Sequence, residues 1–197
     1  MTAAKDPIDK LSSAVHHTEA IISRIRRDQA TLPTPCSSWD VRALINHVVM
    51  QDLRRFTERA RGGGSIELDV GDIGENWIGA YREAAELLLG AWRRPGALEG
   101  TVKLPFGEFP RTWFVGQQIA DLVVHGWDLA KATGQPTELD PELGQLALDW
   151  GRENLRPEFR GRDFGPEVPV AEDAGLHERL AGLFGRDPDW IPSRAGA

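Results

Sequence analysis

The sequence predicts a mainly α-helical bundle followed by a C-terminal extension. In several segments apolar residues recur at alternating steps of three and four, which is the spacing of one stripe of an amphipathic helix. Glycines and prolines, such as Gly62-Gly63-Gly64 and Pro95-Gly96, separate these segments. A chain of 197 residues is long enough for one domain, or one domain with an appendage, around a sizeable core.

Two helices are predicted in the first third of the chain, on either side of Pro33 and Pro35. The first covers residues 6–27 and carries an apolar stripe. The second covers residues 39–60, and Ser37 is its candidate N-cap because a serine oxygen can accept from the free amides of a first turn. The apolar stripe of the first helix consists of Ile8, Leu11, Val15, Thr18, Ile22 and Ile25.

The rest of the chain alternates predicted helices with extended segments. The helix that begins at residue 111 is expected to end at Gly134, with Pro136 just beyond, and the next has Pro141 in its first turn. A short hairpin or an extended loop is predicted around Phe106-Gly107. The predicted segments are helices at 74–94, 111–133 and 141–155, a hairpin at 100–110, an extended piece at 164–170 and one short helix within 173–190.

Composition excludes several classes of protein. Lysine and arginine number 23 and aspartate and glutamate 30, so the net charge of −7 argues against nucleic-acid binding. A single cysteine, Cys36, excludes an intrachain disulfide and cysteine-rich zinc folds. Without an apolar signal region or an apolar run near the ~20 residues of a membrane span, we expect a cytoplasmic protein with no membrane partner. Seven tryptophans allow for a homodimer but leave the oligomeric state open.

The predicted helix 111–133 carries the most informative pattern. Apolar residues cover most of its circumference, so protein should surround most of it. The polar residues fall together in a remaining wedge of roughly 100° that contains no lysine, arginine or glutamate. Short polar side chains without long charged stems favour an internal polar cluster over a solvated face. This wedge consists of Gln117, Gln118, Asp121, His125 and Asp128.

Within the wedge, Asp121 and His125 lie four residues apart on one helical face. A carboxylate and an imidazole at this spacing can share one divalent ion, although a plain hydrogen bond or a solvated pair is the favoured interpretation of this spacing. A third ligand must come from another segment. An ideal helical wheel places His47 away from the apolar centre of its helix and therefore predicts that it is exposed, while His16, His17 and His177 are expected to face solvent.

Two further sets of residues allow a functional or a structural interpretation. Cys36 precedes a helix whose amide dipoles would lower a thiol pKa, but a small filler in a proline-bounded turn is the favoured interpretation. Arg152, Arg156 and Arg160 recur about every four residues and could hold a substrate carboxylate. A solvated face is the favoured interpretation of these arginines.

Two stretches resemble the metal-binding domain of the mycothiol-dependent maleylpyruvate isomerases, which belong to the DinB-like group of four-helix bundles. They are TPCSSWDVRALINHVV around His47 and ADLVVHGWDLAKATGQP around Asp121 and His125. The resemblance covers residues 8–136. It implies a DinB-like bundle over residues 1–136. We expect residues 137–197 to form a small α/β extension packed on this bundle.

The resemblance also implies a site and a chemistry. The family's two histidines and one carboxylate fall on His47, Asp121 and His125, and this set leaves positions open for water or substrate. Zinc is the expected metal, while nickel, cobalt, manganese and iron accept the same ligands. Mycothiol would be the thiol co-substrate of a transferase or isomerase acting on a small electrophile. The residues that could orient the ligands or contact the thiol are Gln117, Gln118 and Asp128.

Two departures from the family and one alternative function accompany this resemblance. The isomerase has glutamate where this chain has Asp121, which would draw a cation closer to helix 111–133. The isomerase also has a larger C-terminal domain, and residues 140–197 show no match to it. The alternative to a thiol-using enzyme is a non-catalytic metal-binding bundle, such as a stress-response or sensor protein.

Overall fold

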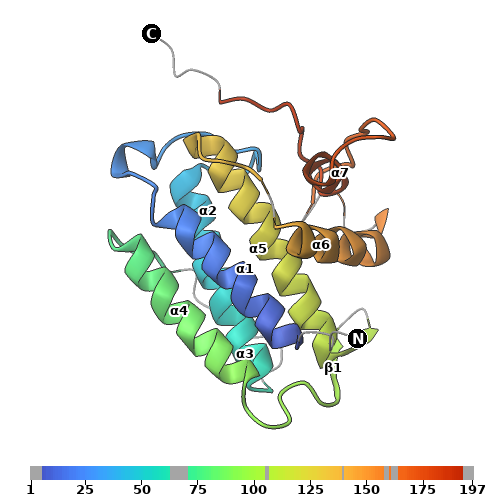
Figure 1. The fold of residues 1–197 in the computed structure, drawn as a ribbon. Helices are drawn as coiled ribbons and strands as arrows, with labels where there is room; N and C mark the ends of the chain where they lie inside the picture. The colour runs from blue at the N-terminus through green and yellow to red at the C-terminus, as the bar shows by residue number, and fades with distance from the viewer. Residues whose placement is uncertain are drawn as a thin grey trace.

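Helical rods packed side by side form a bundle, and further helices lie across it on one side (Figure 1). The structure is a computed structural model that describes residues 6–62, 71–104, 107–138, 140–157, 160 and 164–192. Among these residues, none of the helices has both the length and the apolar character that crossing a bilayer requires. The elements are α1 (Pro7–Ile22), η1 (Arg27–Gln29), α2 (Val41–His47), η2 (Val48–Arg55), α3 (Phe56–Ala60), α4 (Trp77–Trp92), β1 (Thr101–Leu104), β2 (Gly107–Pro110), α5 (Arg111–Thr133), α6 (Pro141–Asn154) and α7 (Leu176–Leu183).

Helix α1 forms where the sequence predicts it but ends about a turn early. The carboxylate of Asp6 caps it by accepting from the amide of Ile8 at 2.9 Å, and most of its predicted stripe is buried. Gln135, beyond the end of α5, donates to the carbonyl of Ile21 at 3.1 Å. This tertiary contact satisfies a carbonyl near the end of the helix. The predicted continuation to Arg27 is wrong, because α1 ends at Ile22.

The second rod is one continuous helix in three pieces, α2, η2 and α3. Asp40 caps it by accepting from the amide of Ala43 at 2.8 Å, so the predicted cap at Ser37 is wrong. The middle piece, η2, is a π-helix. A π-helix bonds each residue to the fifth one along the chain and has more residues per turn than an α-helix, so residues five apart lie nearer to the same face than they would in an α-helix. The ideal α-helical wheel therefore fails along this rod.

Helix α5 is enclosed, as its wide apolar arc predicts. It contacts α1, α2, η2, α3 and α6, and most of its residues from Phe114 onward are buried. It ends at Gly134, whose φ of +70° gives the left-handed cap that glycine adopts readily. The predicted hairpin is confirmed, with β1 pairing antiparallel to β2 from Thr101–Pro110 to Leu104–Gly107, whereas Phe106 lies outside the described residues.

The C-terminal extension packs on the bundle through α6. Helix α6 lies across α5, and α7 packs on α6 (Figure 1). Between these helices the described chain forms an isolated bridge between Arg160 and Phe164, followed by an extended segment whose Val168 amide donates to the Gly182 carbonyl at 2.9 Å. The predicted division after residue 136 falls in the connection between α5 and α6 and stays a prediction.

The tryptophans serve the interior of this fold. All seven are buried or half-buried within the chain, so none offers a fully exposed indole to a second subunit. The large apolar side chains that the described residues expose are Leu87, Leu146 and Ile191. The homodimer allowed by the tryptophan content therefore has no support from those tryptophans.

Candidate metal centre and cavity

A cavity of about 830 Å³ lies between the second rod, helix α5 and the C-terminal extension. Ligand-binding cavities usually measure ~300–1,000 Å³, so this one can hold a small molecule. Its lining joins segments that are distant in the sequence. The lining residues are 35–39 before α2, then His47, Gln51, Asp52, Arg55, Phe56 and Arg59 on the second rod, Trp113, Gln117, Asp121 and His125 on α5, and Trp150, Asn154, Leu155, 164–166, Gly185 and Arg186 from the extension.

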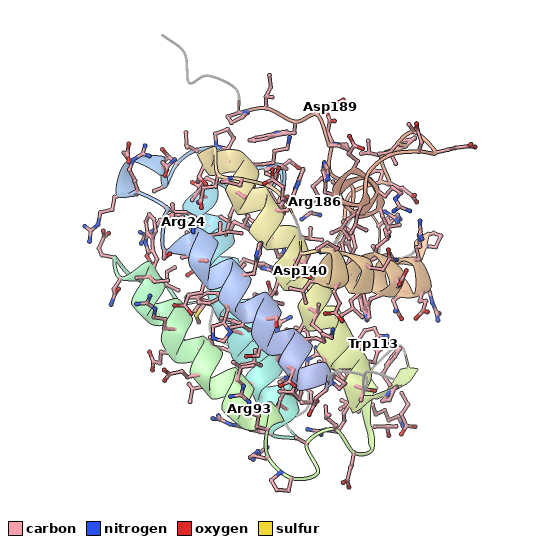
Figure 2. All side chains as sticks on the ribbon, viewed as in Figure 1. Arg24, Arg93, Trp113, Asp140, Arg186 and Asp189 are labelled. Carbon is pink, nitrogen blue, oxygen red and sulfur yellow. The ribbon has the colours of Figure 1, made fainter. Side chains whose placement is uncertain are left out.

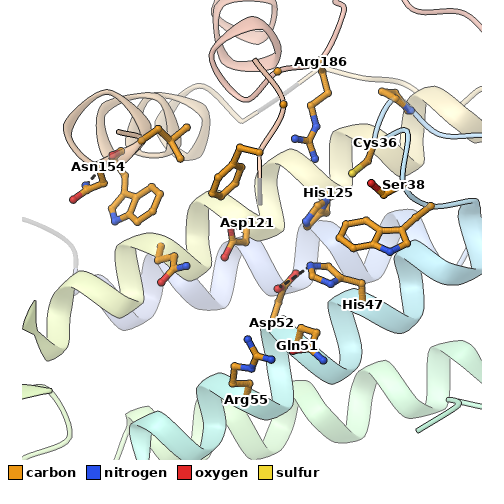
Figure 3. Close-up of a pocket in the computed structure, with 18 of the residues that line it drawn as sticks. Cys36, Ser38, His47, Gln51, Asp52, Arg55, Asp121, His125, Asn154 and Arg186 are labelled. Carbon is orange, nitrogen blue, oxygen red and sulfur yellow. Dashed lines mark hydrogen bonds and ion pairs between the residues drawn. The ribbon is translucent and has the colours of Figure 1, made fainter. Parts of the chain in front are cut away.

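His47, Asp52 and His125 converge on one wall of this cavity (Figure 3). One donor atom from each residue lies within 4.8 Å of the other two, and His47 Nε2 lies 3.4 Å from Asp52 Oδ1. Because η2 is a π-helix, the five-residue step from His47 to Asp52 places both side chains on the same face. Donor atoms that converge in this way could hold a single metal ion.

His47 faces the cavity, although an α-helical wheel predicts that it is exposed. Its ring stacks on Trp39 with centroids 4.1 Å apart and lies edge-on to His125 at 5.1 Å. Its side chain is 23% exposed. Burial lowers the pKa of His47 to about 3, and the neighbouring His125 adds to this effect. The imidazole is therefore neutral at neutral pH, which is the form that binds metals.

Helix α5 and the extension together hold His125 in place. Its Nδ1 lies 3.1 Å from Asp128 Oδ2, and Arg186 donates to the same carboxylate oxygen at 3.0 Å. Figure 2 shows Arg186 between α5 and α7. Burial disfavours the ionised form of Asp128, but Arg186 and His125 outweigh it and lower the pKa of this carboxyl group. The carboxylate thus accepts from Nδ1–H of His125. The other ring nitrogen, Nε2, is then unprotonated and free to bind a metal ion.

Two buried carboxyl groups, Asp52 and Asp121, lie close enough to influence each other. Burial raises the pKa of Asp121 to about 7, although Arg186 and Arg59 oppose the rise. Burial also raises the pKa of Asp52 well above its usual range, and Asp121 adds to the effect. Asp52 Oδ2 is shielded from solvent and has no hydrogen-bond partner. A bound cation would offset the cost of burying these two negative charges, because it stabilises the ionised carboxylates.

Replacing Asp52 with asparagine is expected to stabilise the metal-free protein, and more so at about pH 8 than at about pH 4. The folded protein binds the Asp52 proton more tightly than the unfolded chain does. Stability from this group is therefore complete below the unfolded-state pKa and falls as pH rises toward the folded-state pKa. Asparagine removes this loss. Thermal unfolding of both proteins after chelation and dialysis measures the effect, and an equal difference at both pH values would contradict it.

The structure places the predicted metal ligands in two different ways. His47 and His125 meet as the resemblance implies, and Asp121 lines the same cavity. Asp121 is not a member of the close cluster, however, because the carboxylate that completes it is Asp52. Sequence reasoning missed Asp52, since its five-residue spacing from His47 is informative only once the π-helix is known.

The three predicted polar contacts also differ in position. Gln117 lines the cavity. Gln118 lies outside the cavity lining: its amide nitrogen donates to the Asp52 carbonyl, and its oxygen accepts from Trp92 Nε1 at 3.3 Å. Asp128 is likewise behind the lining, where it orients His125. Contact of a bound thiol with Gln118 or Asp128 is therefore not supported by their positions.

The remaining candidates have simpler roles. Cys36 lines the cavity, but burial raises the pKa of its thiol, and the helix begins only at Val41, too far along to lower it. Arg152 and Arg156 are exposed and, like Arg160, do not line the cavity, so the solvated interpretation is the better one. The other three histidines lie outside the cavity lining, with His16 and His177 exposed and His17 half-buried.

Fold and site define a helical-bundle protein with a pocket of histidine and carboxylate side chains between its helices. The sequence profile described as "Mycothiol maleylpyruvate isomerase N-terminal domain" matches residues 11–130. The chain belongs to this family. It is also 34% identical over 183 residues to an uncharacterized protein found in two strains of Mycobacterium tuberculosis, and the match covers 92% of this chain and 98% of that protein.

Solved structures show the same fold. Two crystal structures of the mycothiol-dependent maleylpyruvate isomerase, one of them a histidine-to-alanine mutant, superpose with TM-scores of 0.66 at 13% and 15% identity. The likeness confirms the DinB-like fold. It covers 97% of this chain and 93% of the isomerase chain, so the structural likeness extends into residues 140–197, for which the sequence showed no match.

Proposed function

We propose that this protein is a metal-dependent enzyme that uses mycothiol to isomerise or transfer a small electrophilic substrate. The observation that carries the proposal is the convergence of His47, Asp52 and His125 on a cavity large enough for a small ligand. Membership of the mycothiol maleylpyruvate isomerase N-terminal domain family supports the thiol and an isomerase-type reaction. The 13–15% identity to the isomerase leaves the substrate to be identified by experiment.

The side chains at this site fit a divalent cation. His47 and His125 are neutral donors, and Asp52 has a buried oxygen without a hydrogen-bond partner. We propose these two histidines as ligands together with a carboxylate, either Asp52 from the cluster or Asp121 as the family motif implies. Two imidazoles and a carboxylate suit zinc first, and also nickel, cobalt, manganese or iron. Such a cation would lower the pKa of a thiol that binds it.

The other residues of the cavity position the reactants. Asp128 fixes the ring of His125 so that Nε2 faces the cluster. Gln117 offers an amide to the interior of the cavity, where it can hydrogen-bond polar parts of a thiol cofactor. Trp39 covers one face of His47 and excludes water from that side. The extension lines one side of the cavity, which reduces the access of solvent to a reactive thiolate.

Mycothiol, or a cysteine-derived surrogate, is expected to raise the unfolding temperature of the metal-loaded protein. A ligand at 100 times its Kd stabilises the state it binds by about 2.7 kcal/mol, or roughly 5–10 °C for a chain of this size. The control ligand is the analogue with a hydroxyl in place of the thiol, which should give a much smaller shift. If metal is retained but no thiol shifts the unfolding temperature, the non-catalytic metal-binding alternative is favoured instead.

A further inference from the structure

A second polar region of the cavity lies on the wall formed by the end of η2 and by α3. Arg55 and Arg59 are four residues apart on this rod, and both line the cavity. Among the described residues, neither guanidinium group has a hydrogen bond or an ion pair, and Arg55 Nε is shielded from solvent without a partner. Arg55 and Arg59 are half-buried, and two unpaired guanidinium groups on the wall of one cavity are unusual, because charged groups that are partly removed from water are normally paired.

Arg59 is held in place by aromatic rings. Its guanidinium carbon lies 4.9 Å from the centre of the Phe114 ring and 5.4 Å from that of Phe56. Both rings are buried, with exposures of 0% and 4%. A cation held over aromatic rings uses none of its N–H groups in hydrogen bonds to them, so these donors stay free. Those donors are therefore fixed in position and available to a ligand.

The charges around this wall favour an anion. Like charges four residues apart on a helix repel each other, so an anion between Arg55 and Arg59 relieves a repulsion that the free protein contains. Asp52 and Asp121 interact with these arginines only at longer range, since no ion pair joins them among the described residues. These two arginines also place positive charge on one wall of the cavity, although the chain as a whole has a net charge of −7.

We propose that Arg55 and Arg59 form an anion subsite that binds the carboxylate of a small organic acid. The inference rests on the proposed function in one respect: if the reaction proposed above occurs, its electrophilic substrate carries this acid group. Guanidinium groups bind carboxylates through two parallel N–H···O bonds, which fixes the orientation of the ligand as well as its position. The histidine cluster lies on the same cavity, so a bound acid would extend toward it.

The test measures binding of succinate to metal-free protein by calorimetry, with neutral succinamide and inorganic phosphate as comparison ligands. Metal is removed by a chelator that is then dialysed away, because a chelator is itself an anion. Succinate is expected to bind the parent protein, and succinamide is not. Each of Arg55→Gln and Arg59→Gln should weaken succinate binding about 10- to 100-fold, because a charge-assisted hydrogen bond is lost.

Two further variants make the outcome decisive. Arg54→Gln is the matched control, since Arg54 lies on the same rod outside the cavity lining and should bind succinate normally. Arg59→Lys keeps the positive charge but loses the planar guanidinium group that can form two parallel hydrogen bonds with a carboxylate. This variant should bind succinate with intermediate affinity, and such binding would also show that the site is folded. Succinate binding is measured on metal-free protein without a thiol, so a failure of the metal or thiol experiments leaves this subsite standing.

Two results would overturn the proposal. One is that succinate does not bind the parent protein, or that it binds Arg55→Gln and Arg59→Gln with the same affinity as the parent. The other is that phosphate binds more tightly than succinate and competes with it, which would assign the subsite to phosphate esters instead.

Discussion

Replacing Arg186 with methionine is expected to destabilise the protein by about 3–5 kcal/mol, because it leaves the carboxylate of Asp128 buried without its cation. Arg186 is 5% exposed and Asp128 is 0% exposed, so water cannot replace the lost partner. At ~2–4 °C per kcal/mol, the unfolding temperature should fall by roughly 6–20 °C. Thermal unfolding in the presence of a chelator measures this effect separately from metal binding.

Two controls distinguish the ion pair from the loss of side-chain volume. Replacing the exposed Arg152 with methionine should change stability by no more than about 0.5 kcal/mol. The double variant Arg186→Met, Asp128→Leu should recover much of the loss, since removing both members of a buried pair is far less costly than removing one. An unfolding temperature equal to that of the parent for Arg186→Met would show that Asp128 does not depend on this partner.

His125→Ala is expected to lower metal affinity by more than about 100-fold, because the substitution removes a direct ligand and losing even the support of a ligand costs 10–100-fold. His47→Ala should have a similar effect. Metal content after dialysis and competition with a coloured chelator measure both. His16→Ala is the matched control, since His16 is exposed on α1 and should leave metal binding unchanged. Equal metal content in all four proteins would mean that the cluster holds no cation.

The same titration identifies the carboxylate ligand. If Asp52 bonds to the cation, Asp52→Asn lowers metal affinity more than Asp121→Asn does, as its position in the cluster indicates. If the family motif determines the ligand, the order is reversed. The two outcomes also differ in structure, because a cation held by Asp52 is bound mainly to the second rod, whereas one held by Asp121 is bound mainly to α5.

Much of the fold could be predicted because it depends on local signals. Helix α5 begins at Arg111 and ends at Gly134 as predicted, since the apolar arc, the glycine cap and the following proline lie within one stretch of chain. The hairpin and α6 follow from similar local patterns. The family motifs add the pairing of His47 with His125, which periodicity alone argues against. These are properties of short segments, and a sequence displays them directly.

Tertiary structure decided the features that join distant segments or depart from α-helical spacing. The π-helix places Asp52 beside His47, and no wheel drawn at ~100° per residue could group them. Arg186 reaches Asp128 across 58 residues, so nothing local marks it as a partner. The sequence by itself determined which residues carry metal-binding and charged groups. Packing determined which of them share a cavity, because burial and distance arise only when the rods and the extension come together.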